Sequence, residues 1–169
     1  MGLFSFIKNA GAAMFGSKDE EDKIEAEIKS RNDAQVENLN RLKAQRALEM
    51  RLSALGLAAE GVSIDVNDGV VTLKGKVKDQ ETAEKIVLAV GNTNGVESVD
   101  NDLEVEHKVP AATFHTVVSG DTLSKIAQKY LGSANKYPAI FEANKPMLKD
   151  PDKIYPGQVL RIPLPAEQA

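Results

Sequence analysis

The stretch HTVVSGDTLSKIAQKY, residues 115–130, contains the first half of a pattern that decides the fold of the C-terminal third. Its β-branched residues at 116–118 favour an extended segment, and the Ser-Gly pair that follows interrupts it. Asp121 is positioned to accept the free amide hydrogens that open a helix. Apolar residues then recur at helical spacing up to Leu131, and Gly132 provides a stop. These signals predict a strand followed by a short amphipathic helix.

The second half of the pattern is FEANKPMLKDPDKIYPGQVLRIP, residues 141–163. Just before it, Pro138 can open a second helix, because the amide hydrogen that proline lacks would be unpaired there. Pro156-Gly157 predicts a type II turn, and residues 159–162 favour a return strand. The resulting βααβ order over residues 113–163 resembles the LysM domain.

A second unit is predicted in the middle of the chain. Residues 62–66 and 70–75 alternate apolar and polar side chains around the turn signal Asp68-Gly69, which predicts a β-hairpin. A helix at 81–90, ended by Gly91, and a strand at 95–105 follow. Upstream, Leu48, Leu52 and Leu55 line one face of a helix that Gly56 stops. The αββαβ order over residues 43–108 resembles the BON domain, so the fold class is α+β.

Two segments precede this unit. Residues 1–16 form an amphipathic pattern, for which packing against the rest of the protein is favoured over a membrane surface. Residues 17–42 are highly charged, with a capping box at Ser17 and Glu20, and indicate a helical linker or insertion. A partner-binding coiled coil is the alternative, although the apolar spacing is irregular for heptads. We therefore expect a monomer.

Composition excludes several classes of protein. The chain has 169 residues, a net charge of −4 and no cysteine, which excludes disulfides and thiolate metal sites and disfavours nucleic acid as a partner. No apolar stretch is long enough to span a membrane and no secretory signal is recognisable, so we expect a cytoplasmic protein. His107 and His115 are expected at the surface or at a strand edge, and neither is placed to activate a nucleophile such as Ser119. Asp100 and Asp102 are expected on a solvated strand face.

Taken together, MGLFSFIKNAGAAMF at the start, LAVGNTNGVESVD at 88–100 and IFEANKPML at 140–148 make nearly the whole chain similar to the family of cytoplasmic bacterial potassium-binding proteins with BON and LysM domains. The resemblance implies a non-catalytic sensor or buffer that binds K⁺ and becomes more compact. It also implies that main-chain carbonyls bind the ion. The residues that correspond by position are Ile7, Ala10, Gly91, Thr93, Val96 and Ile140.

The loop at residues 91–95 is physically suited to such a site. The last carbonyls of a helix lack intrahelical partners and lie at the negative end of its dipole, and glycines let the backbone curl. A weakly hydrated monovalent cation is well held by several neutral oxygens. Read without the resemblance, the same loop is a plain helix cap and turn.

A rival function comes from the LysM resemblance, which implies binding of peptidoglycan or another N-acetylglucosamine polymer in a shallow groove. A third possibility is that this groove is occupied by the BON-like unit and binds only protein. The corresponding groove residues are Ser119, Gly120, Asp121, Thr122, Ile154, Tyr155 and Pro156.

Overall fold

The computed structural model describes residues 18–164, with side chains from residue 22 onward. The chain divides into two units, Met1–Lys43 and Ala44–Ala169. The predicted capping box and the amphipathic segment at residues 1–16 lie outside the described side chains.

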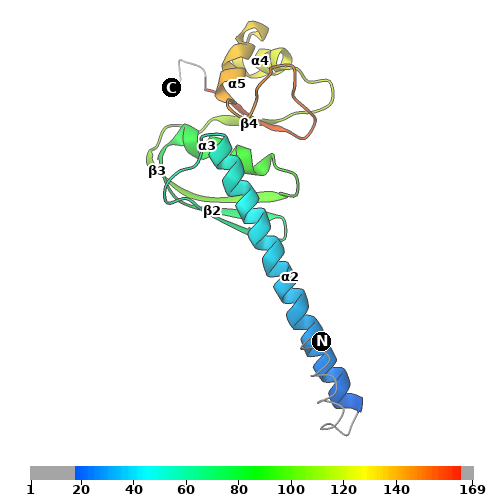
Figure 1. Cartoon of the computed structure of the whole chain (residues 1–169). Helices are drawn as coiled ribbons and strands as arrows, with labels where there is room; N and C mark the ends of the chain where they lie inside the picture. Colours follow the sequence, from blue (N-terminus) through cyan, green and yellow to red (C-terminus); the bar gives the residue numbers. More distant parts are fainter. Residues whose placement is uncertain (1–17, 165–169) are drawn as a thin grey trace. The chain divides into compact units, whose positions relative to one another are not determined.

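A single helix, α2 (Lys18–Ala54), replaces the separate surface helix and domain helix that the sequence pattern suggested (Figure 1). No glycine or proline interrupts this stretch, so nothing in the backbone forces a break. The helix ends at Ala54, just before the predicted stop at Gly56, whose φ of 67° is left-handed. Near this end Leu48 and Leu52 are buried, whereas the large apolar residues between positions 24 and 42 are exposed.

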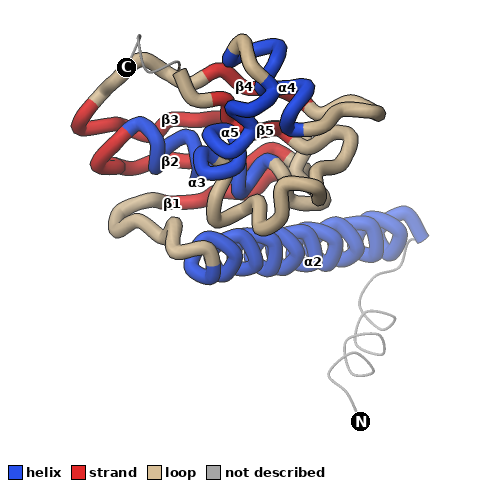
Figure 2. Tube along the Cα trace, turned by 90° about the horizontal axis from the view of Figure 1, so that it is seen from above, coloured by secondary structure: helices blue, strands red, loops and turns tan. Residues whose placement is uncertain are grey.

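The BON-like domain contains a three-stranded sheet in the order β1-β2-β3. Strands β1 (Ser63–Asn67) and β2 (Val70–Asp79) form the predicted antiparallel hairpin, and positive φ values at Asp68 and Gly69 fit its tight turn. Helix α3 (Gln80–Gly91) then crosses over to β3 (Ser98–His107), which pairs parallel to β2. Figure 2 shows α3 alongside these strands.

The core of this domain forms where α2, α3 and the sheet meet. Asp79 caps α3, because its side chain accepts a hydrogen bond from the backbone N–H of Thr82 at 2.8 Å. The cap fixes the direction of α3 and therefore the face that it buries. The buried apolar side chains include Leu48, Leu52, Ile64, Val71, Leu73, Val77, Ile86 and Val90.

The LysM-like domain has the predicted βααβ order. Strands β4 (Thr113–Thr116) and β5 (Val159–Ile162) pair antiparallel, and helices α4 (Leu123–Leu131) and α5 (Tyr137–Ala143) lie between them in sequence, joined by the short 3₁₀ helix η1 (Ala134–Lys136). Gly132 ends α4 with a φ of 75°, and Pro138 lies in the first turn of α5, both as predicted. The core is made of Val117, Leu123, Ile126, Ala127, Ile140, Leu148, Leu160 and Ile162.

One local prediction in this domain is corrected. Thr122, not Asp121, caps α4: its hydroxyl accepts the Lys125 backbone N–H at 3.2 Å. Asp121 accepts instead from the Val118 backbone N–H at 3.0 Å and contacts His115 Nε2 at 2.8 Å. Because the carboxylate already closes this turn, the next residue performs the capping.

His115 lies on β4, an edge strand of the two-stranded sheet, in line with the prediction, but it is not fully exposed. Its side chain is only 11% exposed and lies between Asp121 and the hydroxyl of Tyr130, which is 3.2 Å from Nδ1. The pKa of Asp121 is lowered, first by the hydrogen bond from the Val118 backbone and then by the one from His115. His107 is exposed on β3, as predicted.

Candidate functional site

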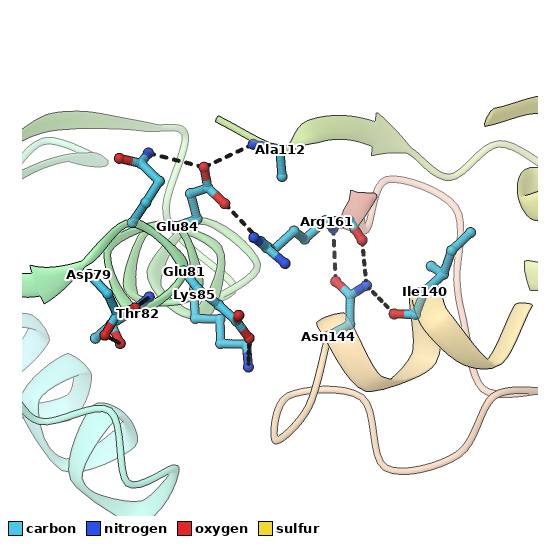
Figure 3. Close-up of polar contacts among 10 residues, drawn as sticks. Asp79, Glu81, Thr82, Glu84, Lys85, Ala112, Ile140, Asn144 and Arg161 are labelled. Atoms are coloured by element: carbon cyan, nitrogen blue, oxygen red, sulfur yellow. Dashed lines mark hydrogen bonds and ion pairs between the residues drawn. The ribbon is translucent and has the colours of Figure 1, made fainter. Parts of the chain in front are cut away.

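The described part of the chain has its most highly connected polar contacts where α3 meets β5. Glu84 points from the middle of α3 toward the LysM-like domain and is only 5% exposed (Figure 3). Its carboxylate accepts hydrogen bonds from Arg161 Nε at 2.7 Å, from the Ala112 backbone N–H at 3.0 Å and from Gln80 Nε2 at 3.0 Å. A buried carboxylate requires such compensation, since an unpaired charge in the interior is very unfavourable.

Asn144 extends this contact into the LysM-like core. Its Oδ1 accepts from the Arg161 backbone N–H at 2.8 Å, and its Nδ2 donates to the carbonyls of Arg161 at 2.8 Å and Ile140 at 2.7 Å (Figure 3). The side chain is 2% exposed, so these bonds satisfy a buried amide. A chain of hydrogen bonds therefore runs from α3 through β5 to α5.

A second contact between the domains lies at the C-terminal end of α3. The Asn92 amide donates to the Val159 carbonyl at 2.9 Å and accepts from the Val159 backbone N–H at 2.8 Å. One side chain thus satisfies both backbone groups of a β5 residue. Asn92 is also the C-cap of α3, which extends through Gly91. The helix thus ends at Gly91, as predicted, but Gly91 is its last helical residue and does not adopt the positive φ of a left-handed cap.

Two cavities flank Asn92, and both are lined by both domains. One, of about 250 Å³, is lined by Gly91, Asn92 and Val96 on one side and by Phe114 and Val159 on the other. The second, of about 360 Å³, is lined by residues that include Arg51, Leu88, Asn92, Met147, Tyr155 and Gln158. The structure thus places the loop after α3 between the two domains.

Of the six residues expected to supply main-chain carbonyls, four are described. The carbonyls of two of them accept no hydrogen bond from a described residue, and those of the other two do. Gly91 and Val96 share the smaller cavity, and no described residue donates a hydrogen bond to either carbonyl. The Thr93 carbonyl accepts the Val96 backbone N–H at 3.1 Å. Ile140 is fully buried in the LysM-like core, and its carbonyl accepts from Asn144. Ile7 and Ala10 lie outside the described residues.

The residues expected to form a glycan groove come from two loops that are held side by side. Val117 exchanges two backbone hydrogen bonds of 2.8 Å, one with Gln158 and one with Gly157. This pairing brings the turn before α4 next to the Pro156-Gly157 turn. The BON-like domain does not cover the loops: Ser119, Gly120, Thr122, Tyr155 and Pro156 are exposed, and Asp121 and Ile154 are partly buried.

Sequence reasoning missed the residues that join the domains. Glu84 had a detectable signal, since it lies four residues before Leu88, a buried apolar position of α3, and so shares a face with it. Asn144, directly after α5, and Asn92, directly after α3, look like ordinary helix-terminal residues. Their partners, Arg161 and Val159, are distant in sequence, and no local pattern links the pairs.

The described residues contain neither a cluster of metal-ligating side chains nor a membrane-spanning helix. Within residues 18–164 no group of three or more histidine or acidic side chains is arranged to hold a metal ion. Asp100 and Asp102 are exposed on β3, as predicted. None of the helices in this part of the chain has the length and apolar character needed to cross a membrane.

The fold and the junction define a two-domain protein that joins a BON domain to a LysM domain through α3 and β5. Family models agree with this class: the BON domain model matches residues 41–107 and the LysM domain model matches residues 115–163.

Comparison with curated proteins identifies the family. The chain is 43% identical over 168 residues to the potassium binding protein Kbp of Escherichia coli O6:H1, covering 96% of this chain and 99% of the relative. An uncharacterized protein of Deinococcus radiodurans is 49% identical over 51 residues, and the esterase Rv1288 of Mycobacterium tuberculosis is 46% identical over 54 residues. These two matches cover only 19% and 11% of the relatives. The chain belongs to the BON–LysM family that includes Kbp.

Proposed function

We propose that this protein binds a potassium ion through main-chain carbonyls at the junction of its BON and LysM domains. The observation that carries the proposal is the loop after α3: it lines a cavity shared by the two domains, and Asn92 within it is hydrogen-bonded to β5. The naming of the Escherichia coli relative as a potassium binding protein supports the choice of ion.

The donor chemistry of the loop fits potassium better than a divalent ion. Calcium and magnesium sites in proteins rely on carboxylates, whereas a weakly hydrated monovalent ion can be held by several neutral carbonyls. The Gly91 and Val96 carbonyls are the first choice, because no described residue donates to them. A carbonyl has two lone pairs, so Thr93 and Ile140 can keep their present hydrogen bonds and still bind an ion. Ile7 and Ala10 complete the proposed set.

Ion binding at the domain junction would couple the potassium concentration to the arrangement of the two domains. An ion bound by carbonyls of both domains binds only the docked arrangement, so it stabilises that arrangement by mass action. The protein would therefore become more compact as the potassium concentration rises. This behaviour suits a cytoplasmic sensor or buffer and involves no catalysis, in keeping with two non-catalytic domains.

Isothermal titration with KCl, NaCl and CaCl₂ tests the ion, and small-angle scattering in the same salts tests compaction. We expect heat and a smaller radius of gyration with KCl that equimolar NaCl does not reproduce. Equal responses to both monovalent salts, or a response to CaCl₂ alone, would reject the proposal.

A matched pair of variants tests the location of the site. Asn92→Ala removes the contact of the loop with β5, whereas Asn94→Ala changes an exposed amide of the same loop. We expect the first variant to weaken potassium binding by at least about tenfold, corresponding to the loss of one or two partly buried hydrogen bonds. Equal affinities for the two variants would place the ion elsewhere.

The second candidate function is peptidoglycan binding by the LysM domain. Two large apolar side chains, Val118 at 58% and Tyr155 at 51% exposure, lie on the paired loops that correspond to the glycan groove. Exposed aromatic and apolar groups beside polar loop residues suit the faces of sugar rings. Sedimentation with insoluble peptidoglycan tests this function, with Tyr155→Ala as the variant and Tyr137→Ala, a similarly exposed tyrosine on α5, as its control.

A further inference from the structure

The first unit carries a stripe along α2 that neither proposed function uses. Its positions are separated by four, three, four, four and three residues, which places them on one face of the helix. We define the stripe as Ile24, Ile28, Arg31, Gln35, Leu39 and Leu42.

The stripe is apolar at both ends and polar at its centre. Its four large apolar side chains, two isoleucines and two leucines, are between 37% and 51% exposed. Val36 is also exposed, at 58%, but lies about a quarter turn away from the stripe. The stripe is therefore a distinct face, and an apolar residue of the same helix lies outside it.

Two apolar clusters exposed on one helix face indicate a binding surface. Helices in proteins owe most of their stability to the packing of an amphipathic face, and the described residues leave this one open to solvent. The positions recur every eleven residues, as from Ile28 to Leu39, and this period is close to that of a straight α-helix. A second helix can therefore follow the stripe without the supercoil that heptads impose.

The order of residues in the stripe is nearly symmetric about residue 33. If two copies of the helix run antiparallel around that centre, both apolar clusters are covered by the apolar clusters of the other copy. Ile24 of one copy then lies level with Leu42 of the other, and Ile28 lies level with Leu39. In a parallel pair, each apolar cluster would face the same cluster of the other copy, and each polar position would face the same polar position.

The polar centre of the stripe favours the antiparallel register. This register places Arg31 of one copy opposite Gln35 of the other, whose amide oxygen can accept a hydrogen bond from the guanidinium. Arg31 can keep its ion pair of 2.8 Å with Glu27 in its own helix, since a guanidinium has five N–H donors. A parallel pair would instead place Arg31 against Arg31. Polar residues at such positions specify register and orientation at a cost in stability.

Charge along the helix selects the same orientation. Residues 19–27 contain six acidic residues and one lysine, whereas residues 38–43 contain Arg41 and Lys43 and no acidic residue. In the antiparallel register Lys43 of one copy comes close to Glu25 of the other, because both lie on the same flank of the stripe. In this register the dipoles of the two helices also point in opposite directions, which is favourable.

We propose that the stripe binds the same stripe of a second copy of this chain, forming an antiparallel helical dimer. The symmetric stripe and the opposite charge at its two ends are each self-complementary, so they specify this partner independently. This inference replaces the expectation of a monomer, which rested on the absence of regular heptads. It does not depend on potassium binding.

The oligomeric state of the full-length protein tests the dimer. By sedimentation velocity over a concentration series, we expect the wild type to approach twice the monomer mass. Ile28→Lys combined with Leu39→Lys should weaken association by at least about tenfold, because charged side chains within an apolar contact are unfavourable. Val36→Lys, an exposed apolar residue off the stripe, should leave the dimer intact. A monomeric wild type, or equal loss of association in both variants, would overturn the proposal.

The chain has no native cysteine, so disulfide trapping can report the orientation. Ile24→Cys and Leu42→Cys proteins, one of them tagged, should cross-link efficiently when mixed and poorly when oxidised separately. Efficient cross-linking of each variant alone would indicate parallel helices and contradict the proposal. If residues 1–16 of the same chain cover the stripe, the wild type stays monomeric and only a variant lacking these residues dimerises, which would also contradict it.

Discussion

Two polar contacts between the BON and LysM domains start from α3 but differ in chemistry. In the middle of the helix, Glu84 and Arg161 form a buried ion pair, with side chains 5% and 12% exposed. At the end of the helix, Asn92 forms two neutral hydrogen bonds to the backbone of Val159. In the ion pair, each buried charge depends on its partner, so that removing either side chain is costly. The amide contact instead positions the backbone of the loop that we propose to bind potassium.

The difference suggests a division of roles. A buried ion pair is weak evidence for net stability, but removing one partner leaves an unpaired buried charge. A neutral amide carries a smaller desolvation cost and can be lost and regained with less consequence. We therefore expect the ion pair to dominate the stability of the docked domains and the amide contact to dominate the response to ligand.

The largest effect is expected for Glu84→Ala. This variant leaves the Arg161 guanidinium buried without its carboxylate and should lower the free energy of unfolding by about 3–5 kcal/mol. Urea denaturation followed by circular dichroism measures the change. The matched control is Glu81→Ala, which removes a more exposed (i, i+4) pair with Lys85 on the same helix and should cost about 0.5 kcal/mol or less.

If the two glutamate variants are destabilised equally, the contrast between a buried and a surface pair is wrong. A refinement is Glu84→Ala combined with Arg161→Met, which removes both charges and retains apolar volume. This double variant should recover a large part of the lost stability, because neither charge is then left unpaired.

An intermediate effect is expected for Asn92→Ala. The change leaves the N–H and carbonyl of Val159 without their partner and should destabilise the protein by about 1–3 kcal/mol. Hydrogen exchange of the Val159 amide should accelerate, while that of Leu73 in the centre of the BON-like sheet should change less. If both amides accelerate equally, the contact is part of a single global unfolding unit and does not act locally.

The smallest effect concerns the cap of α3, which supports both contacts. The pKa of Asp79 is lowered, chiefly because its carboxylate accepts the Thr82 backbone N–H, with further lowering by the Thr82 hydroxyl and by Lys78 and Lys85. The folded protein thus binds this proton more weakly than the unfolded chain. The stabilisation is complete above the ordinary aspartate pKa and is lost as the pH falls through the lower folded value.

Asp79→Asn should therefore flatten part of the decline in melting temperature below about pH 4. Near neutral pH it should cost about 1 kcal/mol or less, since asparagine also caps helices. Thermal melts of both proteins between neutral and acidic pH provide the measurement. A variant whose acid decline matches the wild type would show that other carboxylates dominate this pH range.

Most of the fold could be predicted from the sequence because its signals are local. The Asp68-Gly69 turn, the left-handed Gly132 and the Pro156-Gly157 turn each specify a backbone conformation that few other residues adopt. The errors are local as well. Asp121 was assigned to a cap that Thr122 provides, and α2 continues through a stretch that was expected to contain a boundary, because charge pattern alone does not break a helix.

The candidate site was less accessible to prediction. The loop after α3 was singled out by its position at a helix end, and the structure places Gly91 and Val96 on a cavity at the domain junction. The ligand set itself came from family resemblance and stays a prediction. The polar contacts that hold the junction together were not anticipated, since Glu84 and Arg161 are 77 residues apart and Asn92 and Val159 are 67 apart.

The sequence by itself determined the order of the elements, the turns that join them and the family to which the chain belongs, because each depends on neighbouring residues or on their order. Only the tertiary structure decided that Glu84 pairs with Arg161, that Asn92 holds β5, and that the stripe of α2 is exposed. These outcomes depend on which distant surfaces are brought together and desolvated, and a buried polar group must find its partner wherever the fold places one.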